Sequence, residues 1–135
     1  MKKLISILSF ITLLVSAVSC QKNDSGFNPY YQVSSSFRLV SSLGSEPDFE
    51  NLFSVIDSYV NKRVDTEKEA IAMLDEIVAK TKNVSWHANE GSYVQISISK
   101  LVVKRHTETT VVYDFDDTYR SPKSHIWDAQ GSRDL

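Results

Sequence analysis

Two different spacings of apolar residues follow one another between residues 30 and 115, and they limit the fold more than any other feature of the chain. Apolar residues recur every three or four positions in residues 44–64 and again in 65–83, which predicts two amphipathic helices. Residues 30–43 and 92–115 instead show the alternation and the β-branched content of half-buried strands. Because each helix must bury its apolar stripe, the sequence predicts an α+β fold. A helical hairpin packs on one face of a mainly antiparallel sheet of three or four strands, in the order β-α-α-β-β.

The two helical stretches carry different signals at their N-terminal ends. In the first, Ser45 is placed to cap the helix, and Pro47 suits the first turn, where its missing N–H costs nothing. In the second, Thr66 and Glu69 have the spacing of a capping box. The sequence therefore predicts one helix that begins near Ser45 and another that begins near Thr66.

The strand stretches predict which side chains face the helices. The apolar face of the first strand is predicted to hold Tyr31, Val33, Phe37 and Leu39. In the later strands Val94, Ile96 and Ile98 share a face, whereas Leu101 is out of phase, which predicts a β-bulge near residues 99–100. A hairpin around residues 105–107 is the simplest connection to the last predicted strand.

The first 19 residues have the layout of a bacterial secretory signal, in which two lysines precede an apolar run that ends in small residues. The run is shorter than the roughly 20 residues that a membrane-spanning helix needs. At its end, the sequence AVSC, Ala17 to Cys20, resembles the lipobox of bacterial lipoproteins. That resemblance implies cleavage before Cys20 and attachment of a diacylglycerol to its sulfur, usually with a further acyl chain on the new amino group. The predicted partner of Cys20 is thus a lipid bilayer.

The residues on both sides of the predicted cleavage site support two further hypotheses, one about the cleavage and one about the destination of the protein. Ala17 stands where the lipobox most often has leucine, and residues 17–19 also suit an ordinary signal peptidase, which would leave a free thiol on a secreted protein. Residues Gln21 to Asp24 resemble, in weakened form, the export signal of surface lipoproteins of the Bacteroidota type. Gln21 is also not the aspartate that retains many Gram-negative lipoproteins at the inner membrane. The sequence therefore predicts an outer-membrane anchor and leaves the leaflet open.

The remaining chain is predicted to have three parts: a lipidated flexible tether at 20–29, a single α+β domain at 30–120, and a polar segment at 121–135 that is partly ordered at most. Removal of residues 1–19 takes two of the 15 basic residues and none of the 17 acidic ones, which leaves a formal charge of −4. The basic residues are too dispersed to hold a phosphate backbone, so no nucleic-acid partner is expected. Since Cys20 is the single cysteine, a hydrophobic core and not a disulfide must stabilise the domain.

Candidate site residues are few. The sequence has no HExxH, GxSxG, Walker or GxGxxG motif, and His87, His106 and His125 are interpreted as solvated loop residues. The acidic cluster Asp114, Asp116 and Asp117 suits calcium, but the end of a strand that enters a solvated loop explains it equally well, and no cofactor is predicted. Aromatic side chains are enriched at binding surfaces, so the candidate partner-binding residues are Trp86, Tyr119 and Trp127.

Two classes of function fit these features. The favoured one is a membrane-tethered lipoprotein that acts as a non-catalytic binding or assembly module for an envelope protein or glycan. The alternative is a small cell-envelope hydrolase or lyase that uses His87 or His106 with a carboxylate. The lack of a convergent catalytic motif in the sequence favours the binding module.

Overall fold

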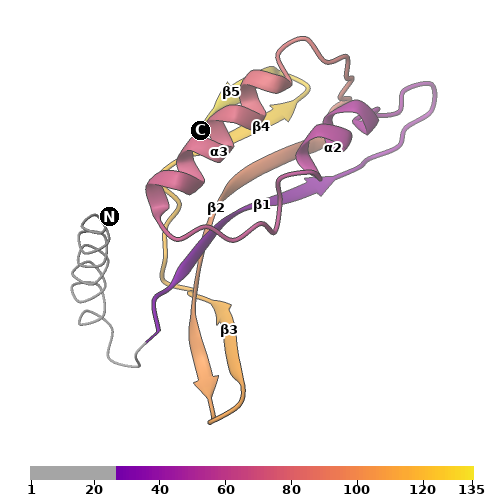
Figure 1. Ribbon diagram of the computed structural model, residues 1–135. Helices are drawn as coiled ribbons and strands as arrows, with labels where there is room; N and C mark the ends of the chain where they lie inside the picture. Colours follow the sequence, from indigo (N-terminus) through magenta and orange to yellow (C-terminus); the bar gives the residue numbers. More distant parts are fainter. Residues whose placement is uncertain (1–26) are drawn as a thin grey trace, which may run out of the picture. The chain divides into compact units, whose positions relative to one another are not determined.

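The computed structural model describes residues 27–135, so Cys20, the lipobox-like residues and the predicted export signal lie outside the described residues. Five strands and two helices follow one another in the described part (Figure 1): β1 (Tyr30–Arg38), α2 (Glu50–Ile56), α3 (Glu67–Lys80), β2 (Tyr93–His106), β3 (Val111–Phe115), β4 (Ser124–Asp128) and β5 (Gly131–Asp134). Neither of these helices is long and apolar enough to cross a membrane. The predicted α+β class is confirmed.

The sheet is built around β2, its longest strand. On one edge β2 pairs antiparallel with β1, from Tyr30 opposite Leu101 to Arg38 opposite Tyr93. On its other edge, residues 93–97 pair antiparallel with β4, and β4 pairs antiparallel with β5. The row of strands is therefore β1-β2-β4-β5, and β3 pairs with β2 outside this row. The antiparallel sheet was predicted, but it has five strands where three or four were expected.

Helices α2 and α3 lie on the same face of the sheet (Figure 1) and share one hydrophobic core with it. The side chains buried most completely are Leu52 and Ile56 of α2, Ala70, Leu74 and Ile77 of α3, and Val33, Val94, Ile96 and Trp127 of the strands. Val94, Ile96 and Ile98 share a buried face, as their alternation predicted. One apolar face of the sheet thus buries the stripes of both helices.

The start of α3 confirms the predicted capping box. The N–H of Glu69 donates to Thr66 Oγ1 at 3.1 Å, and the N–H of Thr66 donates to Glu69 Oε1 at 3.2 Å. Each residue thereby satisfies a backbone donor that the first turn of a helix leaves without an intrahelical partner. Glu67 and Glu69 in the first turn and Lys80 in the last also match the helix dipole.

The first helix begins later than the sequence predicted, and Ser45 is not its cap. Ser45 instead exchanges backbone hydrogen bonds with Ser42, and Asp48 exchanges a pair of 2.8 and 2.9 Å with His87. Because this pairing holds the backbone extended at Asp48, the chain enters the helix only at Glu50. A bridge to a residue 39 positions away thus overrides the local signals that favoured an earlier start.

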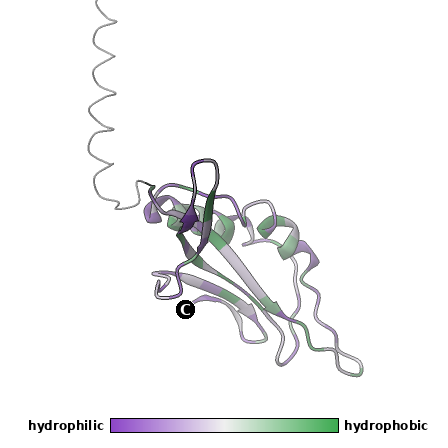
Figure 2. Cartoon of the chain, turned by 90° about the horizontal axis from the view of Figure 1, so that it is seen from below, coloured by the Kyte–Doolittle hydropathy of each residue, from purple (hydrophilic) through white to green (hydrophobic). Residues whose placement is uncertain are grey.

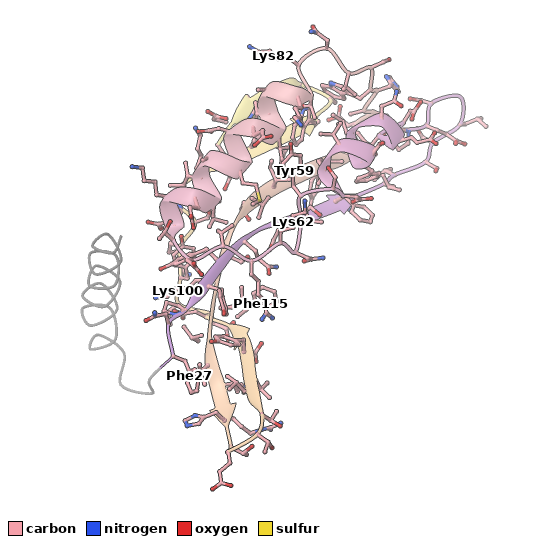
Figure 3. The ribbon with its side chains drawn as sticks, viewed as in Figure 1. Phe27, Tyr59, Lys62, Lys82, Lys100 and Phe115 are labelled. Carbon is pink, nitrogen blue, oxygen red and sulfur yellow. The ribbon has the colours of Figure 1, made fainter. Side chains whose placement is uncertain are left out.

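After α2 the chain does not continue as the long helix that the sequence predicted. Asn61 has a φ of 69°, in the left-handed region that ends a right-handed helix. Val64 then exchanges backbone hydrogen bonds of 2.8 and 2.9 Å with Tyr31, on the edge of β1 opposite the one that pairs with β2. On the same connection Tyr59 and Lys62 lie close together (Figure 3), with the ammonium 5.7 Å from the ring centroid.

The predicted apolar face of β1 is buried only in part. Val33 is completely buried, but the side chains of Phe37 and Leu39 are 56% and 54% exposed. Because α2 has only seven residues, it covers less of β1 than the predicted helix would. The end of this strand therefore presents apolar side chains to solvent.

The predicted bulge is absent from the pairing of β1 with β2. The register is continuous through Lys100, opposite Tyr31, and Ser99, opposite Gln32. Leu101 is out of phase with Ile98, and both side chains are buried. At this part of β2 the sheet therefore has a buried side chain on each face.

Residues 121–135 were predicted to be polar and at most partly ordered, but they contribute β4 and β5 to the sheet. In β4 the two side chains that face the core, His125 and Trp127, are 5% and 1% exposed. Between these two inward side chains lies Ile126, an apolar residue that alternation directs to the other face of the sheet. The buried face of this segment therefore does not coincide with its apolar residues, so counting apolar residues does not reveal that the segment is buried.

Contacts divide the described residues into two compact units, residues 30–101 with 115–135, and residues 27–29 with 102–114. In the smaller unit β3 pairs with the end of β2, which confirms the predicted hairpin. The loop is closed by Thr107, whose N–H donates to the Thr110 carbonyl and whose Oγ1 accepts from the N–H groups of Thr109 and Thr110. The Thr107 hydroxyl thus stabilises this turn by accepting backbone hydrogen bonds, although the turn has no Gly or Asn.

Candidate functional site

An open groove of about 500 Å³ lies beside α2 in the larger unit. Its lining residues are Leu39, Pro47, Asp48, Phe49, Glu50, Phe53, Ser54 and Asp57. They come from the loop after β1, from α2 and from the residue that follows α2. The groove brings together apolar side chains and carboxylates that are separated by up to 18 positions.

Two of the groove's lining residues, Phe49 and Phe53, belong to a row of aromatic rings that extends beyond the groove. Phe37 meets Phe53 edge to face, with centroids 5.2 Å apart, and Phe53 meets Phe49 at 6.2 Å. Phe49 then stacks on Trp86 at 6.2 Å with an interplanar angle of 23°. Such pairs hold their rings in fixed relative orientations, so the aromatic part of the groove is preformed.

Next to the groove, the loop after β1 exposes leucine side chains. Leu39 is 54% exposed and Leu43 is fully exposed, and Figure 2 shows hydrophobic stretches on this loop. The loop is fastened at its base, where the N–H of Val40 donates to Ser92 Oγ at 2.9 Å. At its tip Gly44 has a φ of 80°, which allows the tight turn that displays Leu43.

The charged residues of the groove are all acidic. Among its lining residues Asp48, Glu50 and Asp57 carry carboxylates, and none of the eight is basic. Asp48 Oδ1 accepts a hydrogen bond of 3.2 Å from the N–H of Glu50, which fixes one carboxylate at the start of α2. An apolar surface bordered by negative charge favours a partner that is apolar and positively charged.

The three aromatic residues predicted to contact a partner have different environments. Trp86 is half-buried and stacks on Phe49 at the end of the aromatic row. Trp127 is a core residue with 1% exposure, so the expectation that it presents its ring to a partner is corrected. Tyr119 is half-buried, and its hydroxyl donates to Glu67 Oε2 at 2.5 Å. Burial and that hydrogen bond raise the pKa of Tyr119 well above its ordinary value, so it fastens its segment to α3 as a neutral phenol.

The predicted acidic cluster is not gathered into a metal site. Asp114 pairs with Lys104 at 3.0 Å in the smaller unit. In the larger unit Asp116 accepts from the N–H and the hydroxyl of Thr118 at 3.0 and 2.7 Å, which lowers its pKa. Asp117 is exposed. Within residues 27–135, no three His, Cys, Asp or Glu side chains are grouped to hold a metal ion.

The histidine that the structure brings to a carboxylate is His125, which the sequence placed in a solvated loop. His125 Nδ1 lies 2.7 Å from Asp134 Oδ1, and Nε2 lies 2.6 Å from Ser132 Oγ. By contrast, His87 uses its backbone to pair with Asp48, and His106 packs on the ring of Phe27. The apolar alternation that would reveal a half-buried strand is missing from residues 124–128, because the inward His125 is polar and the outward Ile126 is apolar.

Comparison with known proteins adds no relative: no family model, no curated protein and no solved structure matches the chain. What the groove binds must therefore be inferred from its own side chains and charges. The same applies to the group formed by Ser132, His125 and Asp134.

Proposed function

We propose that this protein is an envelope lipoprotein, anchored in the outer membrane through acylated Cys20, that acts as a binding module through the groove beside α2. The lipobox-like sequence AVSC and the secretory signal before it support the anchor. The groove beside α2, which is lined in part by the exposed Leu39, and the exposed Leu43 on the same loop support the binding role. The anchor restricts the module to the membrane surface, where its partner must also be found.

The observation that carries the binding role is the exposure of Leu39 and Leu43 next to a preformed apolar groove. Covering apolar surface contributes about 25 cal/mol per Å². The aromatic row and the hydrogen bond from Val40 to Ser92 already order the groove and its loop. A partner therefore gains the burial energy without a large ordering cost on this side of the interface.

The charges indicate the chemistry of the partner. Asp48, Glu50 and Asp57 border the apolar lining, so the best occupant is a segment of an envelope protein that carries apolar side chains with lysine or arginine beside them. An acidic segment would place like charges together. A glycan would leave the exposed leucines without apolar contacts.

A fluorescent amphipathic peptide of leucine and lysine is a suitable probe, measured against a soluble form of the protein that begins at Gln21. We expect it to bind, and we expect the double substitution Leu39→Glu with Leu43→Glu to raise the Kd at least about tenfold, the equivalent of about 1.4 kcal/mol. Both side chains are exposed, so the melting temperature should change little. Fluorescence anisotropy gives the Kd of each protein.

The control is Leu135→Glu, the same substitution at an exposed leucine that belongs neither to the groove nor to the loop after β1. It should leave the Kd unchanged. Binding should weaken as the salt concentration rises towards about 0.5 M, because salt screens the acidic border. Equal affinity of the native and doubly substituted proteins, or equal affinity for a peptide of leucine and glutamate, would refute the proposal.

A further inference from the structure

The hairpin of β4 and β5 carries a group of three side chains that the binding role does not use. We propose that Ser132, His125 and Asp134 form a catalytic site that hydrolyses carboxylic esters, with Ser132 as the nucleophile. The proposal rests on the geometry of the group and is independent of the groove beside α2.

The pairing of the two strands creates the group. His125 lies directly opposite Asp134, and Trp127 lies opposite Ser132, so all four side chains are on one face of the hairpin. Residue 132 is thus the diagonal neighbour of His125, within reach of its ring. On the other face Arg133 donates to both oxygens of Asp128, at 2.8 and 2.9 Å, and this bidentate pair stabilises the register.

Each ring nitrogen of His125 faces the group that a serine hydrolase needs there. Nδ1 lies 2.7 Å from Asp134 Oδ1, and a carboxylate at this distance selects the tautomer with the proton on Nδ1. Nε2 is then an acceptor, and it lies 2.6 Å from Ser132 Oγ. The arrangement is that of a nucleophile, a general base and an orienting acid, which is recognised by geometry and not by order in the sequence.

The imidazole is held in place while the nucleophile is open to solvent. His125 is 5% exposed, and its ring packs edge to face on Trp127 with centroids 4.7 Å apart. The hydrogen bond with His125 lowers the pKa of Asp134, which favours its carboxylate form. Ser132 is exposed on β5, which ends the row of strands in the described part of the chain. A buried base beside an accessible hydroxyl is the combination that an acyl transfer requires.

The register also provides a donor for the oxyanion. The N–H of Leu135 donates to the carbonyl of Ser124 at 3.0 Å, so alternate backbone groups of β5 face β4. The intervening N–H groups, those of Ser132 and Asp134, point to the outer side of the row. The N–H of the nucleophile itself is therefore available to a carbonyl oxygen that approaches from that side.

The reaction needs only the ester and water. Ser132 Oγ attacks the carbonyl carbon while its proton moves to His125 Nε2, and the collapse of the tetrahedral oxyanion breaks the ester C–O bond. The leaving oxygen takes the proton from Nε2 and departs as an alcohol, and the acyl group remains on Ser132. Water, deprotonated by Nε2, then attacks the acyl carbon, and the return of that proton to Oγ releases the acid and restores Ser132.

An ester is the substrate class that fits an open edge. An alkoxide or phenoxide leaves more readily than an amide anion, so an ester demands less protonation of its leaving group than an amide does. The oxyanion donor, the N–H of Ser132, lies on an exposed strand at the end of the described row, where an ester can approach it from the outer side.

The test uses the purified full chain with two probes, a fluorophosphonate that labels active serines and p-nitrophenyl acetate. We expect the phosphonate to attach to Ser132, as located by peptide mass spectrometry, and the acetate ester to be hydrolysed through an acetyl-Ser132 intermediate. Ser132→Ala should abolish labelling and lower the hydrolysis rate at least about a hundredfold. The control Ser36→Ala removes another exposed strand serine and should change neither result.

Asp134 is a positioning residue, and its test separates orientation of His125 from folding. Asp134→Asn should slow labelling at least about a hundredfold with little change in melting temperature, and Asp134→Glu should restore part of the rate. Labelling of Ser132 no faster than that of Ser36, or hydrolysis that survives Ser132→Ala, would overturn the proposal. The three side chains would then serve only to hold β5 against β4.

Discussion

Replacement of Trp127 by alanine is expected to lower the free energy of unfolding by about 3–5 kcal/mol, the largest loss of stability among the substitutions considered. Its side chain is 1% exposed and belongs to the core that α2, α3 and the sheet share. Alanine would leave a cavity that the surrounding helices and strands fill only in part. The measurement is the urea dependence of tryptophan fluorescence, which Trp86 still reports, and of circular dichroism.

The control for this experiment is Leu43→Ala, at a fully exposed position, where the change should stay within about 0.5 kcal/mol. A loss below 1 kcal/mol for Trp127→Ala would mean that β4 is not part of the cooperative core. That result would return residues 121–135 to the exposed, weakly ordered segment that the sequence predicted.

The C-terminal strands show why composition was a poor guide to this part of the fold. Residues 124–128 contain two inward-facing side chains, one of them a histidine, whereas a predictable strand has several apolar residues in alternation. Burial of His125 depends on hydrogen bonds to Asp134 and Ser132, which the next strand supplies. From the sequence alone, a polar residue whose hydrogen-bond partners lie on another strand is predicted to be on the surface.

The two helices differ in this respect, because local chemistry determines the start of α3 but not that of α2. The start of α3 was predictable because Thr66 and Glu69 satisfy each other's backbone donors within one turn. The start of α2 was not predictable, because the pairing of Asp48 with His87 depends on residues far apart in the sequence. The groove was missed for the same reason, since Leu39 and Phe53 meet only after the helix packs on the sheet.

A second large effect is expected at Cys20. If the proposed anchor consists of acyl chains on this residue, Cys20→Ser should move the protein from the membrane fraction to the soluble fraction almost completely. Each buried methylene contributes about 0.8 kcal/mol, and stable anchoring needs at least two chains. Fractionation of cells measures where the protein is located, and the intact mass of the native protein shows whether it carries acyl chains.

The control for the anchor is Ser19→Ala, which keeps a small residue before the cysteine and should leave the protein in the membrane. Native protein that begins at Cys20 with a free thiol and is found entirely in the soluble fraction would contradict the lipoprotein proposal. It would support the alternative, cleavage by an ordinary signal peptidase.

The central claim is that the groove beside α2 binds a basic, apolar segment of a partner. The most direct measurement is an NMR titration of the isotope-labelled soluble protein with the peptide of leucine and lysine. The proposal predicts that the largest amide shift changes fall on the groove and its loop, at Leu39, Leu43 and Phe53, and that they saturate with the Kd from anisotropy. Shift changes confined to other surfaces of the protein, or none at saturating peptide, would contradict it.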